Sequence, residues 1–241
     1  MEITKPQSKL FSKCLFFGPA GGGKTTLLGT AEDDPRTSPM LLLDYEGGLT
    51  SLVGRDIDVV RIRSWQDYNE VYTLLASDGH QYKSVGLDSI SETHIFSLLK
   101  LLDEPGRKGD PNLLAQGDYG KALVQMRRLI REFRDLPLHL FATALAKDDV
   151  DPRIGAIRKP SLVGSFADEA PGLFDLVGYL NIGDVTNEAG EVSTERILIL
   201  QNYPSIRAKV RSPWGTFAPD EIVSPTITSV LDALNFKEAS K

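Results

Sequence analysis

The sequence predicts an α/β fold in which strands and helices alternate around a mainly parallel sheet that ends in an antiparallel hairpin. Three observations lead to this fold class. A glycine-rich stretch at 18–25 lies between a short apolar run and a segment of helical pattern. Apolar runs of strand length then alternate with segments of helical periodicity as far as residue 144. Two further strand-like runs near the C-terminus are joined by a turn at 187–190.

The glycine-rich stretch fits the pattern GxxxxGK[ST] of a phosphate-binding loop. It consists of Gly18, Pro19, Ala20, Gly21, Gly22, Gly23, Lys24 and Thr25, with Thr26 directly after it. Glycines let backbone N–H groups turn toward the phosphates of a nucleotide, Lys24 is expected to reach the β and γ oxygens, and the Thr25 hydroxyl is expected to bind Mg²⁺. A chance glycine-rich turn is disfavoured because a strand precedes the stretch and a helix follows it. The sequence therefore predicts binding of ATP or ADP with Mg²⁺.

The other elements are predicted from apolar runs, from periodicity and from turn residues. The expected strands are 14–17, 40–44, 59–62, 84–88, 139–144, 176–180 and 196–200. The expected helices are 24–31, 65–75, 90–102, 121–136 and 226–234. Ser64 or Asp67 is expected to start the second of these helices. The polar, proline-containing segments 103–111 and 147–165 are expected to be loops.

Length and composition fit a single domain. The 241 residues are 41% hydrophobic, which is enough for a substantial core. We expect an N-terminal extension at 1–10, the main domain at 11–217 and a C-terminal tail or helix at 218–241. One cysteine excludes an internal disulfide and a cysteine-based zinc site.

The charge and the hydropathy of the chain limit which classes of partner it can have. A net charge of −6 argues against a uniformly basic coat for nucleic acid, although a local basic patch stays compatible with it. No run reaches membrane-spanning length, and the polar segment 1–9 lacks the apolar core of a secretory signal. We therefore expect a cytoplasmic protein that has no membrane partner.

Asp88 ends the apolar run 84–88. A carboxylate at the carboxyl end of a parallel strand would lie beside the phosphate loop, where it can hold Mg²⁺ through water. The alternative is that Asp88 caps the following helix through Ser89, Ile90 and Ser91. The phosphate loop upstream favours the Mg²⁺ role.

Glu46 follows the second apolar run, and two glycines come directly after it. These glycines allow a tight turn that aims the Glu46 carboxylate back at the γ-phosphate, where it can orient and polarise an attacking water. The alternative is that Glu46 is an exposed loop acid and that Asp44 takes this role.

At this point the chain resembles the RecA/RadA recombinase core, from about Phe11 to Phe217. The resemblance rests on the phosphate loop, the D-x-E motif after the second strand and the strand that ends in Asp88-Ser89. It implies a three-layer RecA-like P-loop NTPase in which Glu46 is the catalytic base. Within that superfamily the chain is most similar to compact phage and prophage ATP-binding proteins, which include RecA-like single-strand annealing proteins.

The resemblance also implies a sensor of the γ-phosphate at Thr143, where the expected strand 139–144 ends. Recombinases usually carry an asparagine or a glutamine there, and this chain does not. The Thr143 hydroxyl can still hydrogen-bond a water or a phosphate oxygen, but the chain lacks the amide that in the family passes the nucleotide signal to the DNA-binding loop.

Two basic residues, Lys209 and Arg211, resemble the pair that in some RecA-type ATPases reaches across a subunit interface to the neighbour's γ-phosphate. On a strand, a spacing of two puts both side chains on one face. This reading implies a homo-oligomer, either a ring or a filament. The alternative is an ordinary pair of solvated cations on an edge strand.

Four cations lie where recombinases place a mobile DNA loop, and they are Lys147, Arg153, Arg158 and Lys159. Their chemistry suits contacts with the backbone of single-stranded DNA. Three acids and the lack of aromatic residues before Phe166 weaken this reading, and a plain interaction loop is the alternative. The arginines of segment 121–136 are assigned to a solvated helix face in preference to a DNA surface.

Together these features predict a Mg²⁺-dependent, RecA-like ATPase that acts in phage-type DNA recombination or single-strand annealing. The alternative is a nucleotide-dependent interaction or loading module with little DNA affinity of its own. A small-molecule kinase is a more distant reading, because the chain offers few candidates for lid arginines.

Overall fold

The computed structural model describes residues 10–104, 106, 110–186, 189–201, 203–211 and 218–234. Residues 1–9 of the expected N-terminal extension, residues 187 and 188 of the expected turn and residues 235–241 of the expected tail lie outside this part.

The described residues form ten strands and six α-helices. The strands are β1 (Lys13–Gly18), β2 (Met40–Asp44), β3 (Asp58–Arg61), β4 (Ser84–Asp88), β5 (His139–Asp151), β6 (Gly155–Pro160), β7 (Leu176–Thr186), β8 (Val192–Ile199), β9 (Lys209–Val210) and β10 (Glu221–Val223). The α-helices are α1 (Lys24–Gly29), α2 (Trp65–Ala76), α3 (Thr93–Leu102), α4 (Gln116–Asp135), α5 (Phe166–Glu169) and α6 (Ile227–Ala233). Four 3-10 turns span Thr30–Asp33, Leu49–Leu52, Pro111–Leu113 and Ala170–Leu173.

The strands form one sheet in the order β10-β8-β7-β1-β5-β4-β2-β3, with β6 paired to β5 and β9 paired to β7. The six strands from β7 to β3 in this order are parallel to one another. Strand β8 pairs with β7 in antiparallel fashion, and β10 pairs with β8 in the same way. The predicted fold class, a mainly parallel sheet with an antiparallel C-terminal hairpin, is confirmed.

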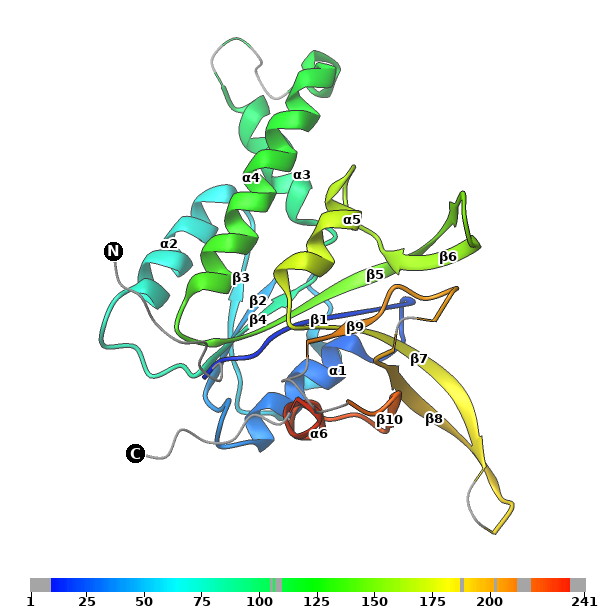
Figure 1. The fold of residues 1–241 in the computed structure, drawn as a ribbon. Coiled ribbons are helices and arrows are strands. Elements are labelled where there is room, and N and C mark those ends of the chain that lie inside the picture. The colour runs from blue at the N-terminus through cyan, green and yellow to red at the C-terminus, as the bar shows by residue number, and fades with distance from the viewer. Residues whose placement is uncertain are drawn as a thin grey trace, which may run out of the picture.

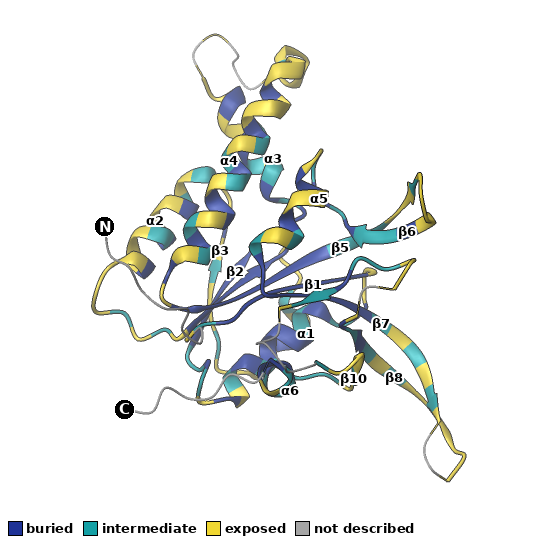
Figure 2. Cartoon of the chain, viewed as in Figure 1, coloured by how far each residue is buried: buried dark blue, intermediate teal, exposed yellow. Residues whose placement is uncertain are grey.

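The sheet lies between two layers of helices (Figure 1). Helices α2, α3 and α4 lie on one face, whereas α1 and α6 lie on the other. Successive side chains of β1 alternate between the two cores: Leu15 and Phe17 belong to the first, and Cys14 and Phe16 belong to the second. Because β1 is covered on both faces, it reads as a continuous apolar run (Figure 2). No described helix has the length and the apolar character needed to cross a membrane.

Helix starts follow from local capping. Ser64 and Asp67 both start α2, because each accepts a hydrogen bond from the other's backbone N–H. Helix α4 begins at Gln116, earlier than the expected residue 121, because the Asp118 carboxylate accepts a hydrogen bond from the Ala115 N–H at 2.8 Å. Helix α3 begins at Thr93, after a turn at 89–92.

The expected loop 147–165 is wrong over much of its length, since β5 continues to Asp151 and pairs with β6 as an antiparallel hairpin. Cross-strand ion pairs stabilise this polar hairpin: Arg158 lies 2.7 Å from Asp148, and Lys159 lies 2.7 Å from Asp149. Thr143 is therefore an interior residue of β5 and does not end the strand.

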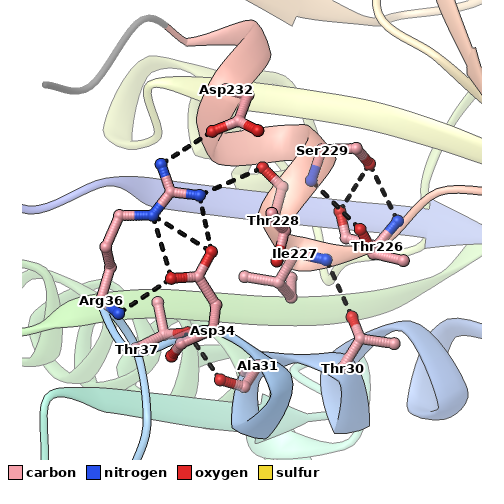
Figure 3. A network of polar contacts seen from close by, with 10 residues as sticks. All are labelled: Thr30, Ala31, Asp34, Arg36, Thr37, Thr226, Ile227, Thr228, Ser229 and Asp232. Carbon is pink, nitrogen blue, oxygen red and sulfur yellow. Dashed lines mark hydrogen bonds and ion pairs between the residues drawn. The ribbon is translucent and has the colours of Figure 1, made fainter.

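The C-terminal helix α6 docks on the core, next to α1 (Figure 3). Its Ile227 N–H donates to Thr30 Oγ1 at 2.8 Å. Arg36 pairs with the buried Asp34 at 2.6 Å and with Asp232 of α6 at 2.8 Å. This network holds α6 against the turn that follows α1.

Candidate active site

The phosphate-binding loop leaves the sheet at the end of β1, where the backbone of β7 comes very close. A Cβ at Gly18 would lie 2.3 Å from the Leu180 carbonyl oxygen, so only glycine fits there. Gly21 and Gly23 have φ angles of 73° and 91°, which side chains disfavour. These glycines are thus required by the backbone path of the loop.

Lys24 is buried under the loop. Its Nζ donates to the carbonyl oxygens of Gly18 at 3.1 Å and Pro19 at 2.8 Å. Burial lowers the pKa of Lys24, while the carboxylates of Asp88 and Glu46 act in the opposite direction. The ammonium group thus lies within electrostatic reach of both acids that the sequence singles out.

Thr25 of α1 and Asp88 of β4 meet, although β5 separates β4 from β1, the strand that leads into the phosphate loop. Thr25 Oγ1 donates to Asp88 Oδ2 at 2.6 Å. Thr143, which lies on the intervening strand, donates to Asp88 Oδ1. Burial raises the pKa of Asp88, and the two hydroxyl hydrogen bonds act in the opposite direction. Asp88 does not cap α3, whose N-cap residue is Glu92.

This donor set fits Mg²⁺ held together with a nucleotide. Among the described residues, no group of three or more His, Cys, Asp or Glu could hold a metal ion alone. A magnesium ion that binds with nucleotide phosphates needs only one or two protein oxygens, because waters and phosphate oxygens complete its octahedron. Thr25 and Asp88 supply two adjacent oxygens of this kind.

Glu46 lies past the end of β2, in a turn that Asp44 holds. Asp44 Oδ1 accepts the backbone N–H groups of Glu46 at 3.1 Å and Gly47 at 2.7 Å, and Asp44 Oδ2 lies 2.9 Å from Arg61. The Asp44 carboxylate is thus committed to the turn. The exposed Glu46 side chain accepts a hydrogen bond from the Ser89 hydroxyl.

Ser89 and Arg61 also contact the acids of the site, and neither contact was predicted from the sequence. Ser89 directly follows Asp88, so a hydroxyl next to a strand-end acid was the available signal. No local signal pointed to Arg61, because its contact with Asp44 depends on the pairing of β2 with β3.

Lys209 of β9 and Arg211, which follows that strand, both bind carbonyl groups of their own chain. Lys209 Nζ donates to Pro171 O, and Arg211 donates to Gly172 O at 2.7 Å. Strand β9 pairs with Leu176 and Val177 at the start of β7, whereas the phosphate loop lies beside Leu180. Lys209 is thus paired three residues before the position on β7 that lies beside the phosphate loop.

The four cations expected at a DNA loop lie on or near the β5–β6 hairpin, and three of them have partners. Lys147 donates to Leu162 O at 3.3 Å. Arg158 binds Asp148 and also donates to the Tyr179 hydroxyl at 3.0 Å, and Lys159 lies between Asp149 and Asp168. Arg153 is exposed in the turn of the hairpin.

Two solved structures show a distant similarity to this chain. One is a prototypical ATPase from the type III secretion system of pathogenic bacteria, with 15% identity and a TM-score of 0.42 over 70% of this chain and 51% of that chain. The other is EssC (ATPases 2 and 3) from Geobacillus thermodenitrificans, with 17% identity and a TM-score of 0.34 over 76% of this chain and 31% of that chain. The chain thus spans about half of the first protein and less of the second.

No curated protein matches the sequence significantly. A protein-family model does match: AAA_24, described as an AAA domain, covers residues 11–212 and so most of the chain. This range contains the phosphate loop, Glu46 and Asp88. The chain therefore belongs to the AAA_24 family of AAA domains and has a P-loop ATPase core.

Proposed function

We propose that this chain is a Mg²⁺-dependent ATPase that acts on single-stranded DNA in phage-type recombination or annealing. The observation that carries the hydrolytic part is the 2.6 Å contact between Thr25 Oγ1 and Asp88 Oδ2, which joins the loop to a strand-end acid. When bound, Mg²⁺ neutralises charge on the β- and γ-phosphate oxygens. Thr25 and Asp88 are the residues that would hold it.

The other residues divide the reaction between binding and proton transfer. Lys24 and the loop amides bind phosphate oxygens. The Glu46 carboxylate orients a water and takes its proton as the water oxygen attacks the γ-phosphorus, while the bond to the bridging β-phosphate oxygen breaks and ADP leaves. We assign Thr143 a positioning role, since its hydroxyl donates to Asp88.

The DNA part of the proposal rests on the β5–β6 hairpin and its connection to the site. Ser91, in the turn that follows Asp88, accepts a hydrogen bond from the Leu145 N–H at 3.0 Å and donates to Ser161 O at 2.9 Å. The turn is thereby bonded to the chain on both sides of the base of the hairpin, next to the Ala146–Pro160 pair. A shift at Asp88 on nucleotide binding would reach the hairpin through these bonds.

A second candidate function is nucleotide-dependent binding of a protein partner. The charge pairing on the hairpin favours it, because cations already bound to aspartates are poor ligands for DNA phosphates. The hairpin also exposes Val150 and Ile154, which are apolar and 74% and 47% exposed.

An ATPase assay with and without single-stranded DNA tests these candidates, alongside a mass measurement of the assembly. The proposal expects DNA to raise turnover and expects Arg153→Glu with Arg158→Glu to abolish that rise. Absence of DNA binding at low salt, where electrostatic affinity is greatest, would rule out the DNA reading. Absence of turnover by a protein that binds ATP would rule out hydrolysis.

We further propose that Lys209 and Arg211 act in trans within a homo-oligomer. The spacing of the two residues, two apart in the sequence, supports a role of this kind. A cation supplied there would stabilise charge that develops during phosphoryl transfer.

A further inference from the structure

A recess of about 460 Å³ adjoins the phosphate loop on the side of the β7–β8 hairpin. It runs along α1, between that helix, the hairpin and the turn before α6. The residues that line it include Gly23, Thr26, Thr30, Ile182, Arg196 and Ser224. The volume is within the range of pockets that hold small ligands, and the lining combines apolar walls with a few polar groups.

Arg196 lies where the recess meets the loop. A Cβ built on Gly23 would lie 2.2 Å from Arg196 Nε and 3.1 Å from Arg196 Cζ, so the guanidinium packs directly on the loop backbone. Arg196 stands opposite Ile182 in the β7–β8 hairpin. The fold of the hairpin thus brings a cation to the residue that precedes Lys24.

The Arg196 side chain is exposed, and its guanidinium has no hydrogen-bond or ion-pair partner within the described part of the chain. This distinguishes it from the arginines at 36, 158 and 207, which all bind aspartates. A planar cation beside a phosphate loop can stack on a nucleobase or bind an anion.

The far wall of the recess is fixed in place. Ser224 adopts a positive φ of 47°, which is unfavourable for a residue with a side chain. Two bonds to β8 hold it there: its N–H donates to Arg196 O at 2.7 Å, and its hydroxyl donates to Glu195 Oε2 at 2.6 Å. At the floor, the bond from Ile227 N–H to Thr30 Oγ1 anchors α6 (Figure 3). The recess is thus a built feature of the fold.

We infer that this recess receives the nucleoside of the nucleotide and that the Arg196 guanidinium stacks on its base. The phosphates would occupy the loop at Gly23 and Lys24, and the nucleoside must continue from them into adjoining space. The recess opens at Gly23 and extends past Thr26, so it provides that space. This inference rests on the proposed binding of ATP and adds the residue that holds the nucleoside.

Isothermal titration calorimetry with Mg²⁺-ATP and with Mg²⁺-tripolyphosphate tests it, because tripolyphosphate has the phosphates and lacks the nucleoside. Arg196→Ala is expected to weaken ATP binding about tenfold, as the loss of one cation–π contact would. Its affinity for tripolyphosphate should stay within about twofold of the wild type. Ile182→Trp, which fills the recess from the other strand, should also weaken ATP binding alone. Arg128→Ala, an exposed arginine on α4, serves as the matched control.

Two outcomes would overturn this inference alone. Unchanged ATP affinity in both recess variants would show that the nucleoside lies elsewhere. Equal weakening of ATP and tripolyphosphate by Arg196→Ala would assign Arg196 to the phosphates. Lack of ATP binding by the wild type would end both this inference and the proposed binding of ATP. Loss of ATP binding in Lys24→Ala, with no change in the two recess variants, would retain the phosphate site and rule out only the nucleoside recess.

Discussion

The Ser89 hydroxyl donates a hydrogen bond to Glu46 Oε1 and so joins the turn after β2 to the residue that follows Asp88. Strands β2 and β4 are neighbours with Asp44 opposite Asp88, which brings the two turns together. The Glu46 carboxylate is thereby held next to the Thr25–Asp88 pair. This contact fits the proposed role of Glu46 as the base and leads us to propose Ser89 as the residue that positions it.

Glu46→Gln should lower kcat at least about a hundredfold, because the amide cannot take a proton from water. ATP affinity, measured by calorimetry, should stay close to that of the wild type. Asp44→Asn is not a suitable control, since Asp44 holds the turn, so Glu70→Gln on α2 provides the matched change of charge. Turnover unchanged by Glu46→Gln would exclude Glu46 as the base.

Ser89→Ala should lower kcat about threefold to tenfold with little change in KM, and Ser89→Thr should restore it.

Thr143→Val should raise the Mg²⁺ concentration needed for half-maximal activity several-fold. The substitution keeps the shape and removes the hydroxyl that donates to Asp88 Oδ1, so the carboxylate loses one of its two side-chain partners. Thr143→Ser keeps the hydroxyl and is expected to behave like the wild type. An unchanged Mg²⁺ requirement in Thr143→Val, measured by titration of the metal at saturating ATP, would argue against positioning by Thr143.

The elements nearest the phosphate loop could be predicted from the sequence because their signals are local. Strands β1, β2 and β4 are short apolar runs bounded by turn residues, and their observed bounds differ from the expected ones by at most one residue. The capping of α2 by Ser64 and Asp67 is equally local.

The remaining features depend on contacts between distant segments. The β5–β6 hairpin is polar, and its stability comes from pairs such as Asp148 with Arg158, which a search for apolar periodicity does not detect. The contact of Ser89 with Glu46 requires β2 and β4 to be neighbours, and the contact of Arg196 with Gly23 requires the β7–β8 hairpin to fold along the loop. The order of the strands in the sheet cannot be predicted from the pattern of any single segment.

Mixed assemblies should reveal whether Lys209 and Arg211 act in trans. A protein with Lys209→Ala and Arg211→Ala, and a second protein with Lys24→Ala, should each have little activity. Mixing them should restore part of the turnover, because a site with an intact loop can then receive the cations of a neighbour. Activity that stays at the level of the separate variants, in a mixture shown by mass to contain both chains, would place the pair outside the neighbour's site.

Arg36→Ala should lower the free energy of unfolding by about 2–4 kcal/mol, since it leaves the carboxylate of Asp34 buried without its partner. The guanidinium of Arg36 lowers the pKa of Asp34 to about 2, which shows the strength of this pairing. Asp232→Asn removes only an exposed partner and should cost at most about 1 kcal/mol. Urea unfolding measures both changes. Equal losses in the two variants would contradict the assignment of Asp34 as the principal partner.

Stability should fall as the pH is lowered from about 6.5 to about 4, through the protonation of His139. Burial, with the nearby charges of Lys13 and Arg36, lowers the pKa of His139 to about 4. Its Nδ1 accepts a hydrogen bond from the Ser12 N–H at 3.1 Å, which requires the neutral ring. The unfolded chain, with a pKa near 6.5, binds the proton first, so the free energy of unfolding decreases across this window by about 3 kcal/mol. Below pH 4 His139 is protonated in the folded protein too, and this contribution levels off.

His139→Gln should remove this slope of stability against pH, measured by urea unfolding at a series of pH values, and His94→Gln should retain it. A slope that persists in His139→Gln would assign the acid sensitivity to other groups; Asp34 is distinguishable, because its loss of stability begins only below about pH 4.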